Sequence, residues 1–381
     1  MTDTTQSDVI VRRVAAAAET VIARRSGYLF GPVFDFLTLG GGSLIVCGAI
    51  ALLLPNGIPI ARFAVPITVL MLVINQPHFA HSYQMFYRNF REKAFGASYA
   101  RALRLRYILA GLVVPAALIA FLAGTALSGS ARMLGYGANL MFFLVGWHYV
   151  KQGYGILIVD SVQKRLMFSE RAKTVFRING YTCWITAWLG SIRALSEPND
   201  YIGLTYFSFP VPQPVYDAAI VVAVLTTLAA LFVLVQRWRE AHTLPWNGVI
   251  AYLATLYLWV IFVGINPLVV AVVPTFHSLQ YLAVVWRYQL NAASPERGIG
   301  FSLASFVGFG MGLGFLGFMA VPRFIDIVFP YDKGLFGPSL FLFCFYIFIN
   351  VHHYFMDSVM WRRGNPDVQQ YVFGRPNTAT R

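Results

Sequence analysis

Long apolar stretches alternate with short polar segments along almost the whole chain. Each stretch has about 20 residues, the length that an α-helix needs to cross the hydrocarbon core of a bilayer. None of them alternates apolar and polar residues like a barrel strand, so the pattern predicts an all-α integral membrane helical bundle. We expect ten transmembrane helices, at residues 33–54, 64–86, 107–128, 134–158, 178–196, 215–236, 246–264, 267–286, 299–321 and 336–360.

The composition agrees with this pattern. Of the 381 residues, 57% are hydrophobic and only 12% are charged, whereas a soluble domain carries about 25% charged residues. A disordered chain, a fibre and a soluble enzyme are therefore excluded. The three cysteines all lie in apolar stretches and form neither a disulfide framework nor a CxxC metal site.

The positions of the basic residues predict how the bundle is oriented. If the N-terminus is cytoplasmic, only five of the 29 Lys and Arg fall in outer segments, namely Arg62, Arg132, Arg193, Arg323 and Lys333. This asymmetry follows the positive-inside rule and predicts cytoplasmic N- and C-termini in a bacterial inner membrane. Topology and contact with the lipid bilayer thus explain the net charge of +13 without any nucleic acid.

Three regions follow from this topology. Residues 1–31 are rich in Arg and Ala and lack the apolar core of a signal peptide, so we expect an amphipathic helix on the cytoplasmic surface. Residues 32–361 form the transmembrane bundle, and residues 362–381 form a cytoplasmic tail.

Six of the seven histidines lie inside predicted helices that all run from the outside to the inside. They are His78 and His81 in the second helix, His148 in the fourth, His277 in the eighth, and His352 and His353 in the tenth. Most of them precede an inner arginine by ten positions, which places the imidazoles in one layer roughly 10–15 Å inside the cytoplasmic face. Polar side chains are costly within a bilayer and usually functional, so this layer predicts a shared site.

Polar neighbours extend the predicted site. Asp357 follows His353 by four residues and shares its helix face, so it is a candidate ligand, an acceptor that orients an imidazole, or a salt-bridge partner of the arginines after it. Asn75, Gln84 and Gln280 are expected to surround the ligands and hold them through hydrogen bonds.

Imidazole is the commonest protein ligand for zinc, iron, copper and nickel. Six histidines and a carboxylate exceed what one tetrahedral zinc requires, so we expect iron, with one or two ions. No catalytic residue is predicted apart from these ligands.

The motifs His78-x-x-His81 and His352-His353 resemble the histidine boxes of membrane iron oxygenases, the fatty-acid desaturases and hydroxylases. The placement of histidines within helices is also similar to that of the Brp/Blh-type carotene dioxygenases. The resemblance implies an iron oxygenase, hydroxylase or desaturase that takes an apolar lipid or isoprenoid substrate, with an electron-donor protein as partner. The desaturase and hydroxylase families carry their boxes mostly on inner extensions and loops, whereas the histidines here lie within helices.

Two alternatives remain open at this stage. Facing histidines at one depth are also the axial ligands of a haem, which would make the chain an electron-transfer or quinone-reacting protein. A polar layer in a membrane bundle is also typical of a transporter for a metal ion or for protons. Zinc is the alternative to iron as the bound metal. The glycines between Gly308 and Gly317 are not a dinucleotide site, because their segment is apolar and follows no strand.

Overall fold

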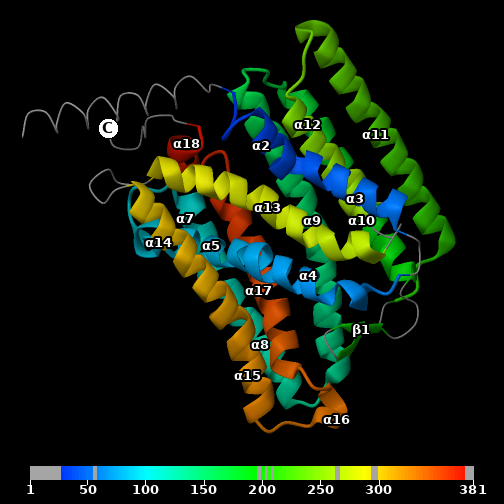
Figure 1. The fold of residues 1–381 in the computed structure, drawn as a ribbon, viewed down its shortest axis with the longest axis vertical. Helices are drawn as coiled ribbons and strands as arrows, with labels where there is room; N and C mark the ends of the chain where they lie inside the picture. The colour runs from blue at the N-terminus through cyan, green and yellow to red at the C-terminus, as the bar shows by residue number, and fades with distance from the viewer. Residues whose placement is uncertain are drawn as a thin grey trace, which may run out of the picture.

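The computed structural model describes residues 27–54, 58–194, 199–201, 204–206, 209–261, 267–292 and 299–373. These residues form an almost entirely helical bundle, with a single short antiparallel hairpin of β1 and β2 (Figure 1). The elements are α2 (Pro32–Phe36), η1 (Leu37–Gly41), α3 (Gly42–Leu53), η2 (Ile60–Phe63), α4 (Ala64–Leu70), η3 (Met71–Asn75), α5 (Gln76–Tyr87), α6 (Phe90–Phe95), α7 (Arg101–Ile108), η4 (Leu109–Val113), α8 (Val114–Leu127), α9 (Ala131–Gln163), α10 (Glu170–Ala194), β1 (Asn199–Tyr201), β2 (Leu204–Tyr206), α11 (Gln213–Ala241), α12 (Trp246–Leu253), η5 (Ala254–Ile261), α13 (Pro267–Ala292), α14 (Ile299–Gly312), η8 (Leu313–Ala320), α15 (Val321–Val328), α16 (Lys333–Phe336), α17 (Leu340–Met360) and α18 (Pro366–Tyr371).

The all-α prediction is confirmed, and each of the ten predicted stretches is helical over most of its described length. Within the described ranges, six helices are long and apolar enough to cross a membrane: Pro32–Leu53, Ala61–Tyr87, Arg101–Leu127, Gln213–Ala241, Leu303–Val328 and Leu340–Met360. The apolar helix Trp246–Ile261 is shorter. The count of ten and the orientation of the termini stay predictions, and most of the expected N-terminal amphipathic helix lies outside the described residues.

Three of the six long helices contain a π-helical turn just before a proline. Pro77, Pro115 and Pro322 stand near the start of α5, α8 and α15, directly after η3, η4 and η8. A proline has no N–H, and its ring collides with the carbonyl four residues earlier. In each case that carbonyl lies inside the π turn, where the wider backbone accommodates the ring and the helix continues.

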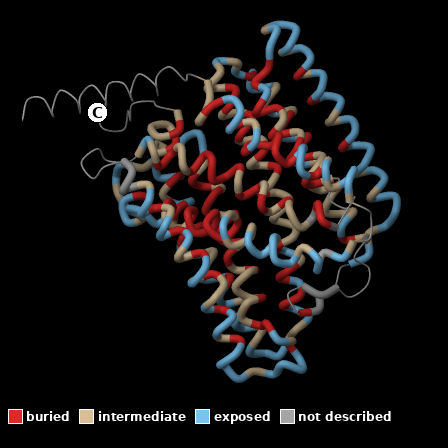
Figure 2. Tube along the Cα trace, viewed as in Figure 1, coloured by how far each residue is buried: buried red, intermediate tan, exposed pale blue. Residues whose placement is uncertain are grey.

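Helices α5, α9, α13 and α17 form the centre of the bundle. Helix α9 packs against α10, α12 and α17, while α5 packs against α13, α14 and α17. Buried residues concentrate in this central region, and exposed residues follow the outer helices, such as α11 (Figure 2). The outer helices carry many exposed large apolar side chains, which suits contact with lipid.

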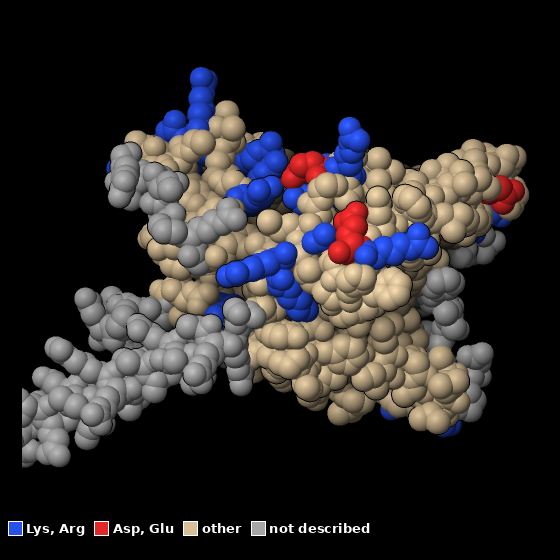
Figure 3. All heavy atoms as spheres, turned by 90° about the horizontal axis from the view of Figure 1, so that it is seen from above, with Lys and Arg blue, Asp and Glu red and all other residues tan. Residues whose placement is uncertain are grey.

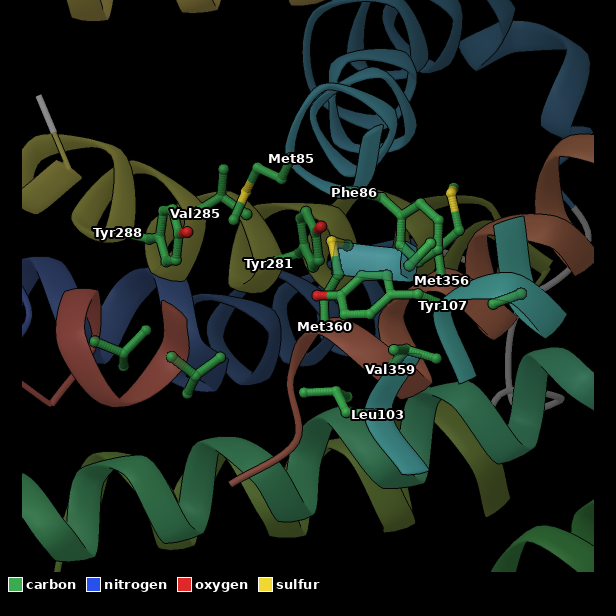
Figure 4. Packing of buried hydrophobic residues seen from close by; sticks show 14 of the residues in the cluster. Met85, Phe86, Leu103, Tyr107, Tyr281, Val285, Tyr288, Met356, Val359 and Met360 are labelled. Atoms are coloured by element: carbon green, nitrogen blue, oxygen red, sulfur yellow. The ribbon is translucent and has the colours of Figure 1, made fainter. Parts of the chain in front are cut away.

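The largest apolar cluster joins α5, α7, α13 and α17 on one side of this centre. Figure 4 shows Phe86, Tyr107 and Met356 packed together, with Tyr281 and Val285 contributed by α13. Phe86, Tyr107, Val285 and Met356 are fully buried. This cluster fixes the rotation of α5, α13 and α17 relative to one another, and it therefore fixes which of their polar side chains point inward.

Candidate metal centre

Four of the six predicted histidines meet at the centre of the bundle. His78 of α5, His148 of α9, His277 of α13 and His353 of α17 each offer a ring nitrogen, and these atoms all lie within 4.8 Å of one another. All four side chains are buried, with at most 5% of each residue exposed. We call this group the four-histidine cluster.

The four rings pack edge to face in a closed square. His78 contacts His277 and His353 at centroid distances of 5.1 and 4.4 Å, and His148 contacts the same two rings at 4.9 and 4.8 Å. The Nε2 atom of every one of the four rings is buried without a hydrogen-bond partner. Buried polar atoms are nearly always paired, so this group of histidines with unpartnered ring nitrogens could hold a metal ion that accepts their lone pairs.

A relay of hydrogen bonds sets the tautomer of His78. The Ser278 hydroxyl donates to Asn75 Oδ1 at 2.7 Å, and it lies 3.2 Å from His78 Nδ1. Because its single proton is directed at Asn75, the hydroxyl oxygen accepts from His78 Nδ1–H. The lone pair of His78 then lies on Nε2, which faces the other histidines. Asn75 is thus linked to the His78 ring through the Ser278 hydroxyl.

Two tyrosines stack on the imidazole rings of His277 and His148. Tyr149 stacks on His277 at 4.2 Å with an interplanar angle of 27°, and Tyr354 stacks on His148 at 4.6 Å with an angle of 25°. Tyr149 is adjacent to His148 in α9, and Tyr354 is adjacent to His353 in α17. Helices α9 and α17 therefore each position a histidine of another helix through the residue that follows their own histidine.

Asp357 faces the cluster from one turn below His353. Its Oδ2 atom lies 3.5 Å from His353 Nε2 and 3.9 Å from His148 Nε2, while Oδ1 accepts from Tyr281 at 3.3 Å and Ser82 at 3.4 Å. The alternative of a salt bridge to the following arginines finds no support, because Arg363 pairs with Glu170 at 3.6 Å instead.

The other buried aspartates of the described residues have a different role. Asp35, Asp160 and Asp326 each accept hydrogen bonds from backbone N–H groups near helix N-termini. Such caps satisfy the first amides of a helix and stabilise it. Asp357 accepts from side-chain hydroxyls and faces imidazoles, so a capping role does not explain its burial.

His81 lies outside the cluster, although it shares a helix with His78. Gln84 Oε1 lies 2.6 Å from His81 Nδ1, and the Gln84 amide donates to the Phe306 carbonyl at 3.2 Å. The imidazole stacks on the Phe306 ring at 4.3 Å, with the planes 8° apart. Gln84 is therefore a partner of His81 and not of the cluster.

His352 also lies outside the cluster, and its hydrogen bonds explain its position. Its Nδ1 is 2.7 Å from the Tyr83 hydroxyl and its Nε2 is 3.0 Å from the Ala110 carbonyl. The carbonyl can only accept, so His352 carries its proton on Nε2 and accepts from Tyr83 on Nδ1. With both nitrogens engaged, this imidazole joins α17 to α5 and η4.

Gln280 is linked to the four-histidine cluster only through Gln152, which contacts the backbone of His277. Its Oε1 accepts from Gln152 at 2.7 Å, and the same Gln152 amide donates to the His277 carbonyl at 2.9 Å. Gln280 itself donates to the Leu39 carbonyl of η1. It therefore fixes α13 against α9 and η1, which positions His277 without touching its ring.

A cavity of about 500 Å³ reaches the cluster from one side. His148, Asp357, Tyr281 and Tyr354 form its inner end. This volume is within the usual range of roughly 300–1,000 Å³ for sites that take a small molecule.

Sequence reasoning did not identify Ser278, Tyr149 and Tyr354 as parts of the site. Ser278 directly follows His277, as Ser82 follows His81, and this repeated His-Ser pair is the sequence feature that could have pointed to Ser278. The tyrosines gave no signal, because aromatic residues next to histidines are common in helices packed by apolar contacts.

No family model, curated protein or solved structure matches this chain.

Proposed function

We propose that this chain is an integral-membrane, metal-dependent enzyme that holds its metal in the four-histidine cluster. The observation that carries the proposal is that four buried histidines from four different helices bring one ring nitrogen each within 4.8 Å of one another, and that each of the four rings has a buried nitrogen without a hydrogen-bond partner. Neutral imidazole nitrogens facing one another suit a divalent transition metal, which accepts a lone pair from each.

The spacing supports one ion rather than two. Metal–nitrogen bonds of about 2.1 Å put adjacent ligand nitrogens about 3.4 Å apart in a tetrahedron, and opposite ones about 4.2 Å apart in a square or octahedral arrangement. The four nitrogens lie within 4.8 Å of one another, so a small contraction would bring them onto one ion. Two ions would need more ligands than these residues offer, because His81 and His352 lie elsewhere.

Iron is the metal that we favour. With Asp357 beside His148 and His353, the site offers five donors, which exceeds the four of a structural zinc site. Nitrogen and carboxylate donors together are typical of non-haem iron oxygenases. A bound iron would supply the activation of O2, and the protein would supply a dry pocket beside the bilayer for a lipid or isoprenoid substrate.

The geometry argues against a haem within the cluster. Ring centroids 4.4 to 5.1 Å apart around the square leave no room for a macrocycle between facing imidazoles. A transporter has less support than an enzyme, because a cavity of about 500 Å³ with both apolar and charged residues in its lining suits an organic substrate more than an ion pathway.

The adjacent histidines of α17 provide a matched test. We would purify the wild-type protein, His353→Gln and His352→Gln in mild detergent and measure metal per chain by elemental mass spectrometry. We expect about one metal per chain in the wild type and in His352→Gln, and a loss of most of it in His353→Gln. His78→Gln against His81→Gln repeats the comparison on α5.

Size-exclusion chromatography of each variant controls for folding. Equal metal content in His353→Gln and His352→Gln, with both variants folded, would refute the proposed centre. A Soret band in the purified protein would show that the chain binds haem and would also refute the proposed centre.

A further inference from the structure

The buried residues that line the cavity beside the cluster differ in chemistry from the exposed ones at its outer end. Five cationic side chains line it, against one exposed carboxylate, Glu170. They are Lys151, Lys173, Arg177, Arg362 and Arg363. Lys and Arg also gather over much of the molecular face seen in Figure 3, with few acidic groups among them.

Most of these cations have no acidic partner. Glu170 pairs with Lys173 at 2.8 Å and with Arg363 at 3.6 Å. Among the residues that the structure describes, no carboxylate lies within 4.0 Å of the cationic atoms of Lys151, Arg177 or Arg362. These three side chains are therefore available to a ligand.

The wall between the two ends is apolar and aromatic. Val159 and Val284 line it together with Trp147, Trp361 and Phe373. Lys151 lies over the Trp147 ring at 4.3 Å, so the boundary between the basic end and the apolar wall is held by a cation–π contact.

We infer that the cavity binds a single-chain amphiphile whose carboxylate or phosphate head is held by Lys151, Arg177 and Arg362, with its apolar chain directed toward His148 and Asp357. The inference rests on the proposed function, since it names the substrate class of that same site. Arginine recognises carboxylate and phosphate by paired hydrogen bonds, and lysine adds a point charge. A cavity of about 500 Å³ suits one chain better than a lipid with two.

Trp147 provides a direct readout, because a brominated chain in the cavity quenches its fluorescence. The purified full-length protein would be titrated with a brominated long-chain fatty acid and with the brominated alcohol of the same length. We expect the acid to bind at least about tenfold more tightly than the alcohol, because only the acid can use the charged end. Because Trp361 lines the cavity as well, the double variant Trp147→Phe/Trp361→Phe should remove most of the saturable quenching.

Charge-removing variants test the assigned residues. R177Q/R362Q should lose about tenfold in affinity for the acid and leave the alcohol unchanged. Arg239→Gln is the matched control, because Arg239 is also exposed on a basic segment but lies on α11, away from the cavity lining. It should leave both affinities unchanged.

Equal binding of acid and alcohol would overturn the inference, as would unchanged affinity in R177Q/R362Q. Displacement of the acid by inorganic phosphate at similar concentration would also overturn it, since the cations would then be holding a free anion. Metal is measured in the same samples. If the wild type contains no metal but still binds the acid selectively, the metal centre is refuted and this inference stands. If the wild type contains metal but binds the acid and the alcohol equally, this inference is refuted and the metal centre stands.

Discussion

Ser278→Ala tests whether the relay from Asn75 to His78 tunes the metal centre. The Ser278 hydroxyl accepts from His78 Nδ1–H at 3.2 Å and donates to Asn75 at 2.7 Å. The substitution removes one oxygen from a fully buried position and takes away the hydroxyl that accepts from His78 Nδ1–H. The imidazole then loses the hydrogen bond that keeps its Nε2 lone pair directed at the other histidines.

The expected loss of metal affinity follows from the cost of removing the Ser278 hydroxyl as a hydrogen-bond acceptor for His78. Leaving a buried N–H unsatisfied costs about 1–3 kcal/mol. Outer hydrogen bonds to metal-bound histidines contribute about 10- to 100-fold to metal affinity, which is about 1.4–2.8 kcal/mol. We therefore expect Ser278→Ala to fold and to bind its metal 10- to 100-fold more weakly than the wild type.

The assay is an equilibrium competition against a chelator of known affinity, with protein-bound metal quantified after separation. Ser43→Ala is the control, because Ser43 is equally buried and its hydroxyl donates to the Gly40 carbonyl within its own helix. Wild-type metal affinity in Ser278→Ala would refute the relay, and the same loss in Ser43→Ala would show a general effect of removing a buried hydroxyl.

Two further substitutions test the packing around the centre. Gly310→Ala should destabilise the protein by about 1–3 kcal/mol, because the new Cβ would lie 2.3 Å from the His81 ring. The loss would be measured as a lower thermal midpoint in detergent. An unchanged midpoint would show that the His81 ring can move aside. Lys93→Met should cost about 1–3 kcal/mol without changing metal content, because the buried Lys93 ammonium donates to the Met85 carbonyl at the end of α5 and pairs with Asp367 at 3.6 Å. A variant as stable as the wild type would contradict that role.

The pattern of apolar residues predicted where the helices lie, but it did not decide which of these helices cross the membrane. Every predicted stretch became a helix, because runs of apolar residues report directly on burial or lipid contact. Six qualify as spans by length and composition within the described residues. Helix α9 carries Lys151, Gln152 and Asp160 within its length, so its composition alone cannot separate a lipid-facing span from a helix enclosed by its neighbours.

The sequence predicted a histidine site on four helices, and the structure brings one histidine from each of them together. It could not distinguish His353 from His352, because adjacent residues on a helix point about 100° apart and only the rotation of α17 decides which faces inward. It also grouped His78 with His81 by their spacing of three. The stacking of His81 on Phe306 comes from side-chain packing between α5 and α14, which no local spacing encodes.

The most direct test of the central claim is an X-ray absorption spectrum of the wild-type protein at the absorption edge of whichever metal it carries. The account predicts a single metal with about four imidazole nitrogens at about 2.1 Å and an additional oxygen ligand, and no neighbouring metal ion. Sulfur ligands, the pattern of a porphyrin, or preparations that repeatedly contain no metal would contradict it.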